Sequence, residues 1–176
     1  MPRFVISPEI SPELFDDLLD CWVDVTNAGG AVGWVPPVSA DDIRPTATTT
    51  LAACADGGPD TLVVGFDDDG RVTCWAVLVS TGHSLMTHWR TVMRVMVHPK
   101  HQGEGYGGEL MRAVAEAGTR LGLESLRLTA RGGLGLEQFY ARHGYREVGR
   151  VPRAIRVAEG DDRDEIYMVT FLPENA

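Results

Sequence analysis

The chain has 176 residues, of which 44% are hydrophobic and 23% charged, a composition typical of a folded globular protein and unlike that of a disordered chain. Sixteen Lys and Arg residues stand against 25 Asp and Glu residues, which gives a formal net charge of −9. This charge argues against nucleic acid as a partner, because a phosphate backbone requires a basic surface. At roughly 150 residues per domain, the length predicts a single domain over residues 1–176.

Targeting and redox features both favour the cytoplasm. The N-terminal stretch MPRFVISPEISPE has prolines and glutamates where a signal peptide has a continuous apolar segment. The longest apolar run, residues 74–79, is far shorter than the roughly 20 residues that span a bilayer. Cys21, Cys54 and Cys74 lack metal-ligand spacing, so we interpret them as reduced thiols. We therefore expect a cytoplasmic protein without a membrane span.

Hydrophobic periodicity and turn residues predict the elements along the chain. In order, the expected elements are a strand at 3–6, helices at 12–26 and 39–55, strands at 61–66, 71–80 and 91–97, a helix at 106–121, a strand at 124–130, a helix at 134–143, a strand at 145–150, an acidic turn at 159–165 and a strand at 165–172. Ser11 before Pro12 is a helix N-cap signal, and Ser39 with Asp42 resembles a capping box. Consecutive strands followed by a strand–helix–strand crossover predict an α/β fold with a mixed, mostly antiparallel seven-stranded sheet flanked by about four helices.

The most informative segment is the glycine-rich stretch HQGEGYGG at 101–108, which lies between a predicted strand and a predicted helix. The first N–H groups of a helix have no intrahelical partners, and the helix dipole is positive there. Glycines let the backbone approach a ligand without an intervening Cβ. This arrangement predicts a cradle for a diphosphate, although a plain tight turn has a similar composition.

One ligand that fits such a cradle is a dinucleotide. Gly103, Gly105 and Gly108 match the GxGxxG pattern, and Arg131 could meet a 2′-phosphate, which would make the protein an NAD(P)-dependent reductase. However, this fingerprint normally opens its domain, and here only about 70 residues follow it, too few for the usual six-stranded sheet.

The second ligand class follows from a family resemblance. Gln102-x-x-Gly105-x-Gly107 resembles the Q/R-x-x-G-x-G/A signature of the Gcn5-related N-acetyltransferases (GNAT). The segment EQFYARHGYREVG at 137–149 is similar to the family's FY-x-x-x-G-F/Y helix-to-strand segment, and the resemblance covers residues 60–172. Within the family, the loop at 29–34 and the C-terminal strands resemble the tabtoxin-resistance type of small antibiotic acetyltransferase.

This resemblance implies acetyl-coenzyme A as cosubstrate. The N–H groups of the loop would hold its pyrophosphate, and the strand before the loop would pair through its main chain with the pantetheine arm. Tyr140 would stand near the sulfur and protonate the leaving thiolate as a catalytic residue. The implied coenzyme-binding residues are Val95, Met96, Val97, Gln102, Gly103, Glu104, Gly105, Tyr106, Gly107, Gly108 and Tyr140.

The general base is left open by departures from the family pattern. Thr91 stands about where many members carry a glutamate, and Glu104 would place a carboxylate beside a diphosphate. His83 and His88, in the link before the long strand, are candidate catalytic residues that could pass the amine proton to water, because imidazole titrates near neutral pH. The alternative for each is an ordinary loop histidine.

Other chemistry-bearing residues have plain alternatives. Trp34 either forms an aromatic wall for a cationic amine or anchors its loop. Asp67–Asp69 and Asp161–Asp162 lack the spacing of calcium or iron sites, so we interpret both as solvated turns and predict no metal.

Together these features predict an acetyl-CoA-dependent N-acetyltransferase that acts by direct transfer on a primary amine of a small molecule. The negative charge, including four aspartates at 16, 17, 20 and 24 in the first helix, favours a cationic acceptor such as an antibiotic or polyamine. The alternatives are the reductase and a non-catalytic acyl-CoA-binding module on the same fold. A homodimer is the default expectation for the oligomeric state.

Overall fold

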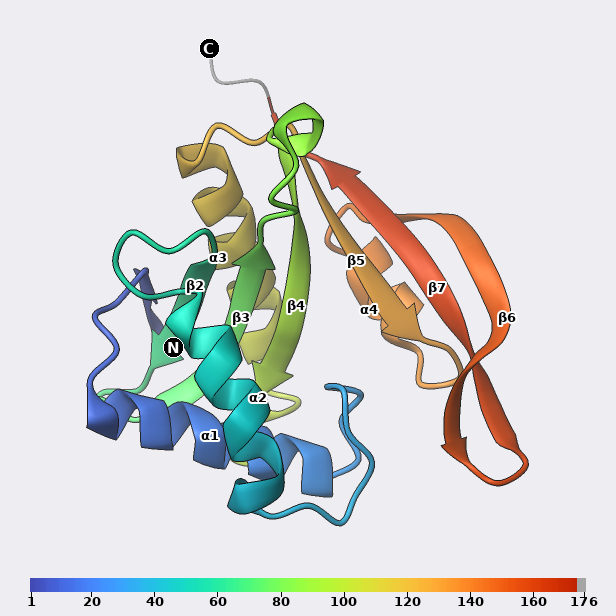
Figure 1. Ribbon diagram of the computed structural model, residues 1–176, viewed down its shortest axis with the longest axis horizontal. Helices are drawn as coiled ribbons and strands as arrows, with labels where there is room; N and C mark the ends of the chain where they lie inside the picture. The colour runs from blue at the N-terminus through green and yellow to red at the C-terminus, as the bar shows by residue number, and fades with distance from the viewer. Residues whose placement is uncertain (174–176) are drawn as a thin grey trace.

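Seven strands and four α-helices form in the predicted order in the computed structural model, which describes residues 1–173 (Figure 1). The elements are β1 (Arg3–Ile6), α1 (Pro12–Asn27), α2 (Ala40–Ala52), β2 (Thr61–Phe66), β3 (Val72–Val79), the 3₁₀ turn η1 (Ser84–Met86), β4 (Trp89–Val97), the 3₁₀ turn η2 (Pro99–His101), α3 (Tyr106–Arg120), β5 (Ser125–Arg131), α4 (Leu136–Ala141), β6 (Arg146–Ala158) and β7 (Asp161–Phe171).

The predicted helix starts are confirmed by their caps. The Ser11 hydroxyl accepts a hydrogen bond from the N–H of Leu14 at 3.2 Å, and Pro12 occupies the first turn of α1. Ser39 and Asp42 form a reciprocal capping box at the start of α2, in which the Asp42 carboxylate accepts from the Ser39 N–H at 2.8 Å. These caps satisfy N–H groups that a helix cannot satisfy itself and so define where each helix begins.

All strands belong to one sheet in the order β1-β2-β3-β4-β5-β7-β6. Every neighbouring pair is antiparallel except β4 and β5, which are parallel and connected through α3. The β4–β5 ladder has only three residue pairs, from Trp89↔Ser125 to Thr91↔Arg127. Beyond Thr91 the two strands separate, so the sheet divides into two parts (Figure 1). The first half-sheet consists of β1 to β4, and the second half-sheet consists of β5, β7 and β6, in that spatial order. The predicted mixed, mostly antiparallel sheet is confirmed.

The helices cover the two half-sheets unequally. α1 and α2 lie over one face of β2–β4, here called the front face, and α3 and α4 lie behind the sheet (Figure 1). The front core includes Trp22, Ile43 and Trp75 and ends at Met96 of β4. The back core, beneath α3, runs on across β5 and β7. Within residues 1–173, the front face of the second half-sheet therefore has no helical cover.

The last hairpin differs from the prediction. Residues 161–165 were expected in an acidic turn, but they pair with β6, and the turn is reduced to 159–160. Arg153 and Arg156 of β6 form ion pairs with Asp162, so charge neutralisation replaces the apolar pairing on which a periodicity argument depends. The interpretation of Asp161–Asp162 as a solvated turn is wrong, whereas Asp67 does occupy a turn, where its carboxylate accepts the N–H groups of Asp69 and Arg71.

All three cysteines are buried and unpaired, and burial raises the pKa of each thiol. Within residues 1–173, no helix has the length and hydrophobicity that a transmembrane span requires.

Candidate active site

The site begins with the free edge of β4. Beyond Thr91 this edge has no partner in β5, so its main-chain groups face open space rather than a neighbouring strand. On its other edge β4 has a β-bulge, because Trp75 pairs with Met96 but Val77 pairs with Met93. Two residues, Arg94 and Val95, thus stand opposite one residue of β3. A bulge re-aims the backbone and leaves a residue outside the ladder, as bulges beside active sites often do.

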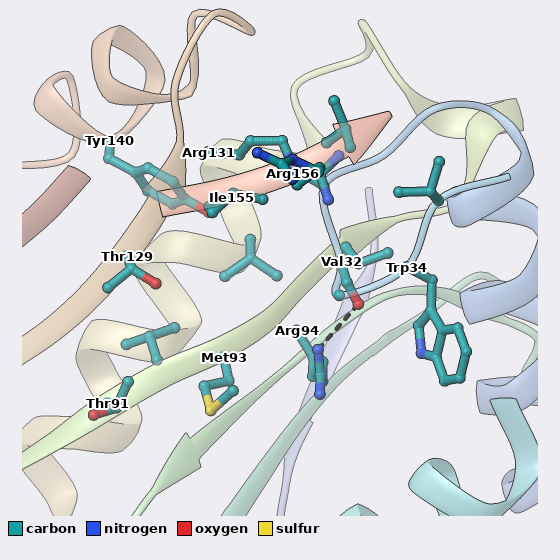
Figure 2. A pocket seen from close by; sticks show the side chains of 16 residues that line it. Val32, Trp34, Thr91, Met93, Arg94, Thr129, Arg131, Tyr140, Ile155 and Arg156 are labelled. Carbon is teal, nitrogen blue, oxygen red and sulfur yellow. Dashed lines mark hydrogen bonds between the residues drawn. The ribbon is translucent and has the colours of Figure 1, made fainter. Parts of the chain in front are cut away.

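Arg94 is the strained residue of this bulge, with a φ of +56° that non-glycine residues adopt infrequently. Its guanidinium stacks 4.5 Å from the Trp22 ring centre and donates to the carbonyl of Val32 at 3.0 Å (Figure 2). The same carbonyl accepts the indole N–H of Trp22 at 3.1 Å. These contacts attach the loop between α1 and α2 to the bulge. A Cβ at Gly33 would collide with this guanidinium, and its φ of +98° is one that other residues rarely adopt, so glycine lets the loop approach without displacing Arg94.

A cavity of about 450 Å³ occupies the split between the half-sheets, and we call it the split cavity. Its walls are the loop at 31–35, β4 from Thr91 to Val95, β5, Tyr140 of α4 and the hairpin residues 155–157 (Figure 2). Trp34 lies in this wall, as one of its two sequence interpretations expects. The volume falls within the usual range of small-molecule sites.

Tyr140 is the predicted catalytic residue that the structure brings to this cavity. Its side chain is only 8% exposed, and its hydroxyl points into the split cavity toward Ile155 and Arg131 (Figure 2). The ring packs edge-on against Phe139 and Tyr145. Burial raises the pKa of Tyr140 to about 12, so the phenol holds its proton at neutral pH.

The glycine-rich loop lies at the end of β4 and leads into α3. Gly103 and Gly105 have φ values of +82° and +87°, and a Cβ on either would meet no heavy atom within 4 Å, so the space beside them is open. Within residues 1–173, the N–H groups of residues 103–107 form no hydrogen bond, whereas those of Gln102 and Gly108 bond to Pro99 and Gly105. Five adjacent free donors at a helix N-terminus fit a diphosphate. Gly107 and Gly108 instead permit close packing, because a Cβ on them would lie 3.2 Å from Phe139 and 3.3 Å from His143.

Side chains of the loop make contacts of their own. The Gln102 amide donates to the carbonyl of Val97 at 3.0 Å and so ties the loop to β4. Glu104 is exposed and lies 3.4 Å from His101, whose ring stacks on Tyr106. Of the other predicted binding residues, Val95 lines the split cavity, Val97 packs toward the back core, and Met96 is buried in the front core, so only its main chain could reach a ligand.

The candidate histidines lie elsewhere. His83 is exposed and caps η1 by accepting the N–H of Leu85, and His88 is exposed directly before β4. Neither lines the split cavity, which begins at Thr91, and in the described part of the chain the cavity lining holds no His, Asp or Glu side chain. The structure therefore does not bring these histidines to Tyr140.

The aspartates of α1 do not reach the split cavity either. Asp17, Asp20 and Asp24 line a separate cavity of about 270 Å³ with Arg71 and His98, and Asp24 forms an ion pair with His98 at 3.0 Å.

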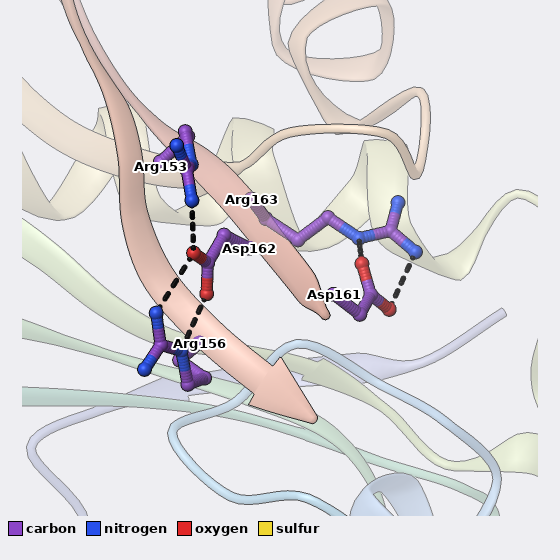
Figure 3. Close-up of polar contacts among 5 residues, drawn as sticks. All are labelled: Arg153, Arg156, Asp161, Asp162 and Arg163. Carbon is purple, nitrogen blue, oxygen red and sulfur yellow. Dashed lines mark hydrogen bonds and ion pairs between the residues drawn. The ribbon is translucent and has the colours of Figure 1, made fainter. Parts of the chain in front are cut away.

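The split cavity is instead lined by three arginines, at 94, 131 and 156. Arg156 is held by Asp162, which accepts its Nε at 2.6 Å and also pairs with Arg153 (Figure 3). These hydrogen bonds lower the pKa of Asp162 to about 2, and the bond from Arg156 has the largest effect. The side chain of Arg131 forms no hydrogen bond or ion pair within residues 1–173, and burial lowers its pKa.

Comparison with known proteins agrees with this geometry. The model of the acetyltransferase (GNAT) domain family matches residues 58–147, which is half of the chain. The chain belongs to the GNAT acetyltransferase family. This membership excludes the dinucleotide-dependent reductase that the glycine pattern left open. No curated protein sequence matches the chain.

Solved structures share the whole GNAT fold at low sequence identity. A GCN5-related N-acetyltransferase from Kribbella flavida has a TM-score of 0.76 at 18% identity, covering 96% of this chain and 98% of its own. A phosphinothricin acetyltransferase from Sinorhizobium meliloti in complex with acetyl-CoA has a TM-score of 0.74 at 16% identity, covering 97% and 88%. A ribosomal-protein-alanine N-acetyltransferase from Brucella melitensis has a TM-score of 0.73 at 17% identity, covering 96% and 99%.

The residues present in this GNAT chain fit acetyl-CoA. The free N–H groups of 103–107 suit its diphosphate, and the unpaired edge of β4 offers main-chain partners to an extended arm. The split cavity at the end of that edge has room for the reacting groups. Within residues 1–173 no group of three or more His, Cys, Asp and Glu side chains could hold a metal ion.

Sequence reasoning missed the arginines of the split cavity. Arg94 could have been noticed only as a charge inside an otherwise apolar strand, TVMRVMV. Arg131 was considered only for a 2′-phosphate, and Arg156 lay outside every predicted element.

Proposed function

We propose that this GNAT enzyme transfers the acetyl group of acetyl-CoA directly to a primary amine of a small molecule. The observation that carries the proposal is the hydroxyl of Tyr140, which reaches the split cavity where the free edge of β4 ends. Acetyl-CoA would supply an activated thioester there. The loop at 102–108 would bind the diphosphate of acetyl-CoA. The main-chain groups of Val95 and Val97 would form hydrogen bonds with its pantetheine arm.

Three groups of the chain then carry the chemistry. Main-chain N–H groups at the Arg94–Val95 bulge would stabilise negative charge that develops on the carbonyl oxygen. Tyr140 would deliver its hydroxyl proton to the thiolate as the C–S bond breaks. The attacking nitrogen would lose one proton to water as the C–N bond of the amide forms, and Tyr140 would regain a proton from water. The walls of the split cavity would orient the amine toward the thioester carbonyl. This orientation lowers the activation barrier, because a positioned nucleophile loses little further entropy in the transition state.

The missing general base has a physical explanation in the charge of the cavity. Nearby positive charges disfavour an ammonium ion, so Arg94 and Arg131, which have no carboxylate partner within residues 1–173, lower the pKa of a bound amine and favour its neutral, nucleophilic form. Arg156 adds little because Asp162 neutralises it. The ammonium form of the acceptor then loses its proton to water on entering the cavity, so this step needs no basic side chain. Thr91 lines the cavity and cannot serve as a base at neutral pH.

The same arginines change our expectation of the acceptor. A cationic, polyamine-like acceptor would meet Arg94 and Arg131 without a neutralising carboxylate, since Asp162 is already bound to Arg156 and the aspartates of α1 line another cavity. The positive charge of Arg131, which has no ion-pair partner in the described chain, favours an acceptor that carries an anion. We therefore propose an amine that also bears an anion, as amino-acid-like antibiotics do.

The test is a coupled assay of free thiol with acetyl-CoA and a panel of amines. Amino acids and acidic amines should release thiol faster than spermidine, and Arg131→Glu should narrow or reverse that order. A preference for spermidine in the wild type would contradict the acceptor assignment. Absence of acceptor-dependent thiol release, with acetyl-CoA bound, would instead indicate a non-catalytic acyl-CoA-binding module.

A further inference from the structure

Next to the split cavity, the front face of the second half-sheet carries large apolar side chains without a cover. Tyr167, Val148 and Phe171 are 40%, 61% and 64% exposed. Their neighbours along β7, Ile166 and Met168, are buried on the opposite face. α1 and α2 cover the front face only over the first half-sheet (Figure 1).

These side chains surround a cavity of about 510 Å³. We call it the distal groove and define it by Trp89, Arg127, Arg146, Val148, Tyr167 and Phe171. Thr91 and Thr129 line both the distal groove and the split cavity, so the two spaces meet at the point where β4 and β5 separate. A molecule that reacts in the split cavity can therefore extend into the groove.

The groove combines aromatic walls with positive charge. The Arg127 guanidinium lies 3.6 Å from the Trp89 ring centre, and that of Arg146 lies 5.3 Å from the ring centre of Phe171. A guanidinium stacked on a ring keeps its N–H groups available for an anion. Neither arginine forms an ion pair in residues 1–173, and no Asp or Glu lines the groove.

We propose that the distal groove binds the part of the acceptor beyond its amine, namely an apolar, ring-sized group that ends in an anion. The proposal rests on the proposed acetyl transfer in the split cavity. Thr129 and Arg127 are alternate residues of β5 on one face, about 7 Å apart along the strand. An amine beside Tyr140 and an anion at Arg127 are thus separated by roughly the length of a dipeptide. The acceptor class is a dipeptide-sized amphiphile with a free amine, an apolar side chain and a terminal carboxylate.

Three probes separate the two halves of this recognition. The first probe is the dipeptide Ala-Phe, which has both the apolar ring and the terminal carboxylate. The second is Ala-Phe amide, which lacks the carboxylate, and the third is Ala-Ala, which lacks the ring. For each, kcat/KM is measured by thiol release, and binding is measured by calorimetry in the presence of coenzyme A. We expect Ala-Phe to exceed each of the other two by at least tenfold in kcat/KM.

Variants assign the preference to the groove. Phe171→Ser should reduce the Ala-Phe to Ala-Ala ratio at least fivefold, and Arg127→Gln should reduce the ratio of Ala-Phe to its amide similarly. Val148→Glu should weaken Ala-Phe binding, whereas Val148→Lys, with the same loss of apolar surface, should not. Leu85→Ser is the control, because Leu85 is 79% exposed and lies outside both cavities.

The outcomes are distinguishable from those for the reaction itself. Equal kcat/KM values for Ala-Ala and Ala-Phe would overturn the proposal for the distal groove and leave acetyl transfer standing. The same follows if Phe171→Ser leaves the ratio of kcat/KM for Ala-Phe to that for Ala-Ala unchanged. Binding of Ala-Phe that depends on Phe171 without any acetylation would support the groove and overturn the proposed function. A dimer that Val148→Glu dissociates would show that a second copy covers this face and would overturn the proposal, as would absence of binding by all three probes.

Discussion

The two half-sheets differ in cover and in charge. Residues 1–97, which contain the first half-sheet, include five arginines and thirteen acidic residues, whereas residues 98–176 contain eleven basic and twelve acidic residues. The first half-sheet has helices on both faces, and the second has them on one face only (Figure 1). The overall charge of −9 therefore describes the first half of the chain and misrepresents the surface where the proposed acceptor binds. Local charge, not net charge, indicates which ligand a cavity accepts.

The difference suggests a division of labour. The first half-sheet leads into the glycine-rich loop and offers the free edge of β4, both of which we assign to the coenzyme. The second half-sheet contributes Arg131, Arg156 and the distal groove, which we assign to the acceptor. Changes on the coenzyme side should act alike on all acceptors, and changes on the other side should depend on the acceptor.

The largest effect is expected for Gly105→Val on the coenzyme side. A β-branched residue is rarely found at a φ of +87°, so the loop must take another path and lose its cradle. A hydrogen bond to a charged group contributes about 1.5–3 kcal/mol, so loss of two weakens acetyl-CoA binding on the order of 100-fold. Calorimetry measures the affinity, and circular dichroism verifies the fold.

Gly70→Val is the matched control for this change. Gly70 has a φ of +77° and open space around it, but it lies in the β2–β3 turn. It should show the same backbone strain with unchanged coenzyme affinity. Equal affinity for wild type and Gly105→Val would mean that the loop is only a turn.

Tyr140→Phe tests the residue that faces both sides. Removal of the hydroxyl leaves the ring packing intact and deprives the thiolate of its acid. We expect kcat to fall tenfold or more, about 1.4 kcal/mol or above, for every acceptor, with coenzyme affinity nearly unchanged. Tyr145→Phe is the control, since its buried hydroxyl has no hydrogen-bond partner in the described chain. A kcat within about twofold of wild type, with chemistry rate-limiting, would exclude Tyr140 as the acid.

The pH profile sharpens the distinction between enzyme groups and acceptor. No His, Asp or Glu of the described chain lines the split cavity, so the rise of kcat/KM with pH should follow the amine pKa of each acceptor. Because burial raises the pKa of Tyr140 to about 12, the acid form persists and no fall should follow up to about pH 10. The measurement is kcat/KM as a function of pH for two acceptors whose amines differ in pKa. A rising limb at one fixed pH near 6.5 for both would instead indicate a histidine base.

The smallest effect is expected for Glu104→Lys, again on the coenzyme side. The exposed carboxylate lies beside the free N–H groups of the loop and repels a diphosphate. Its reversal should tighten acetyl-CoA binding a few-fold at low salt and less at high salt, because exposed charges are screened. Glu124→Lys, in the link between α3 and β5, changes net charge equally and should have little effect. Weaker binding in Glu104→Lys would show that the carboxylate makes a needed contact.

The sequence predicted the parts of this enzyme that depend on local rules. Caps at Ser11 and Ser39, apolar periodicity and the glycine pattern depend on neighbours in the chain, and the structure confirms the elements they predicted. The arginine lining could not be predicted, because Arg94, Arg131 and Arg156 come from three strands and meet only after the sheet divides.

The last hairpin shows the same limit. β6 is almost entirely exposed, so it has no apolar alternation to detect, and Pro152 inside it argues locally against a strand. As an edge strand it tolerates the proline, and ion pairs to Asp162 extend its pairing.

The three-pair ladder between β4 and β5 has a consequence for the lifetime of the protein. A short ladder, the Arg127–Trp89 stack and the back core connect the half-sheets within residues 1–173, so opening at the split needs the loss of few hydrogen bonds. A ligand that pairs with the free edge of β4 stabilises the closed state in proportion to the logarithm of its concentration. Resistance to proteolysis should therefore rise with acetyl-CoA, so that the supply of its substrate would help to determine how long each copy of the enzyme survives.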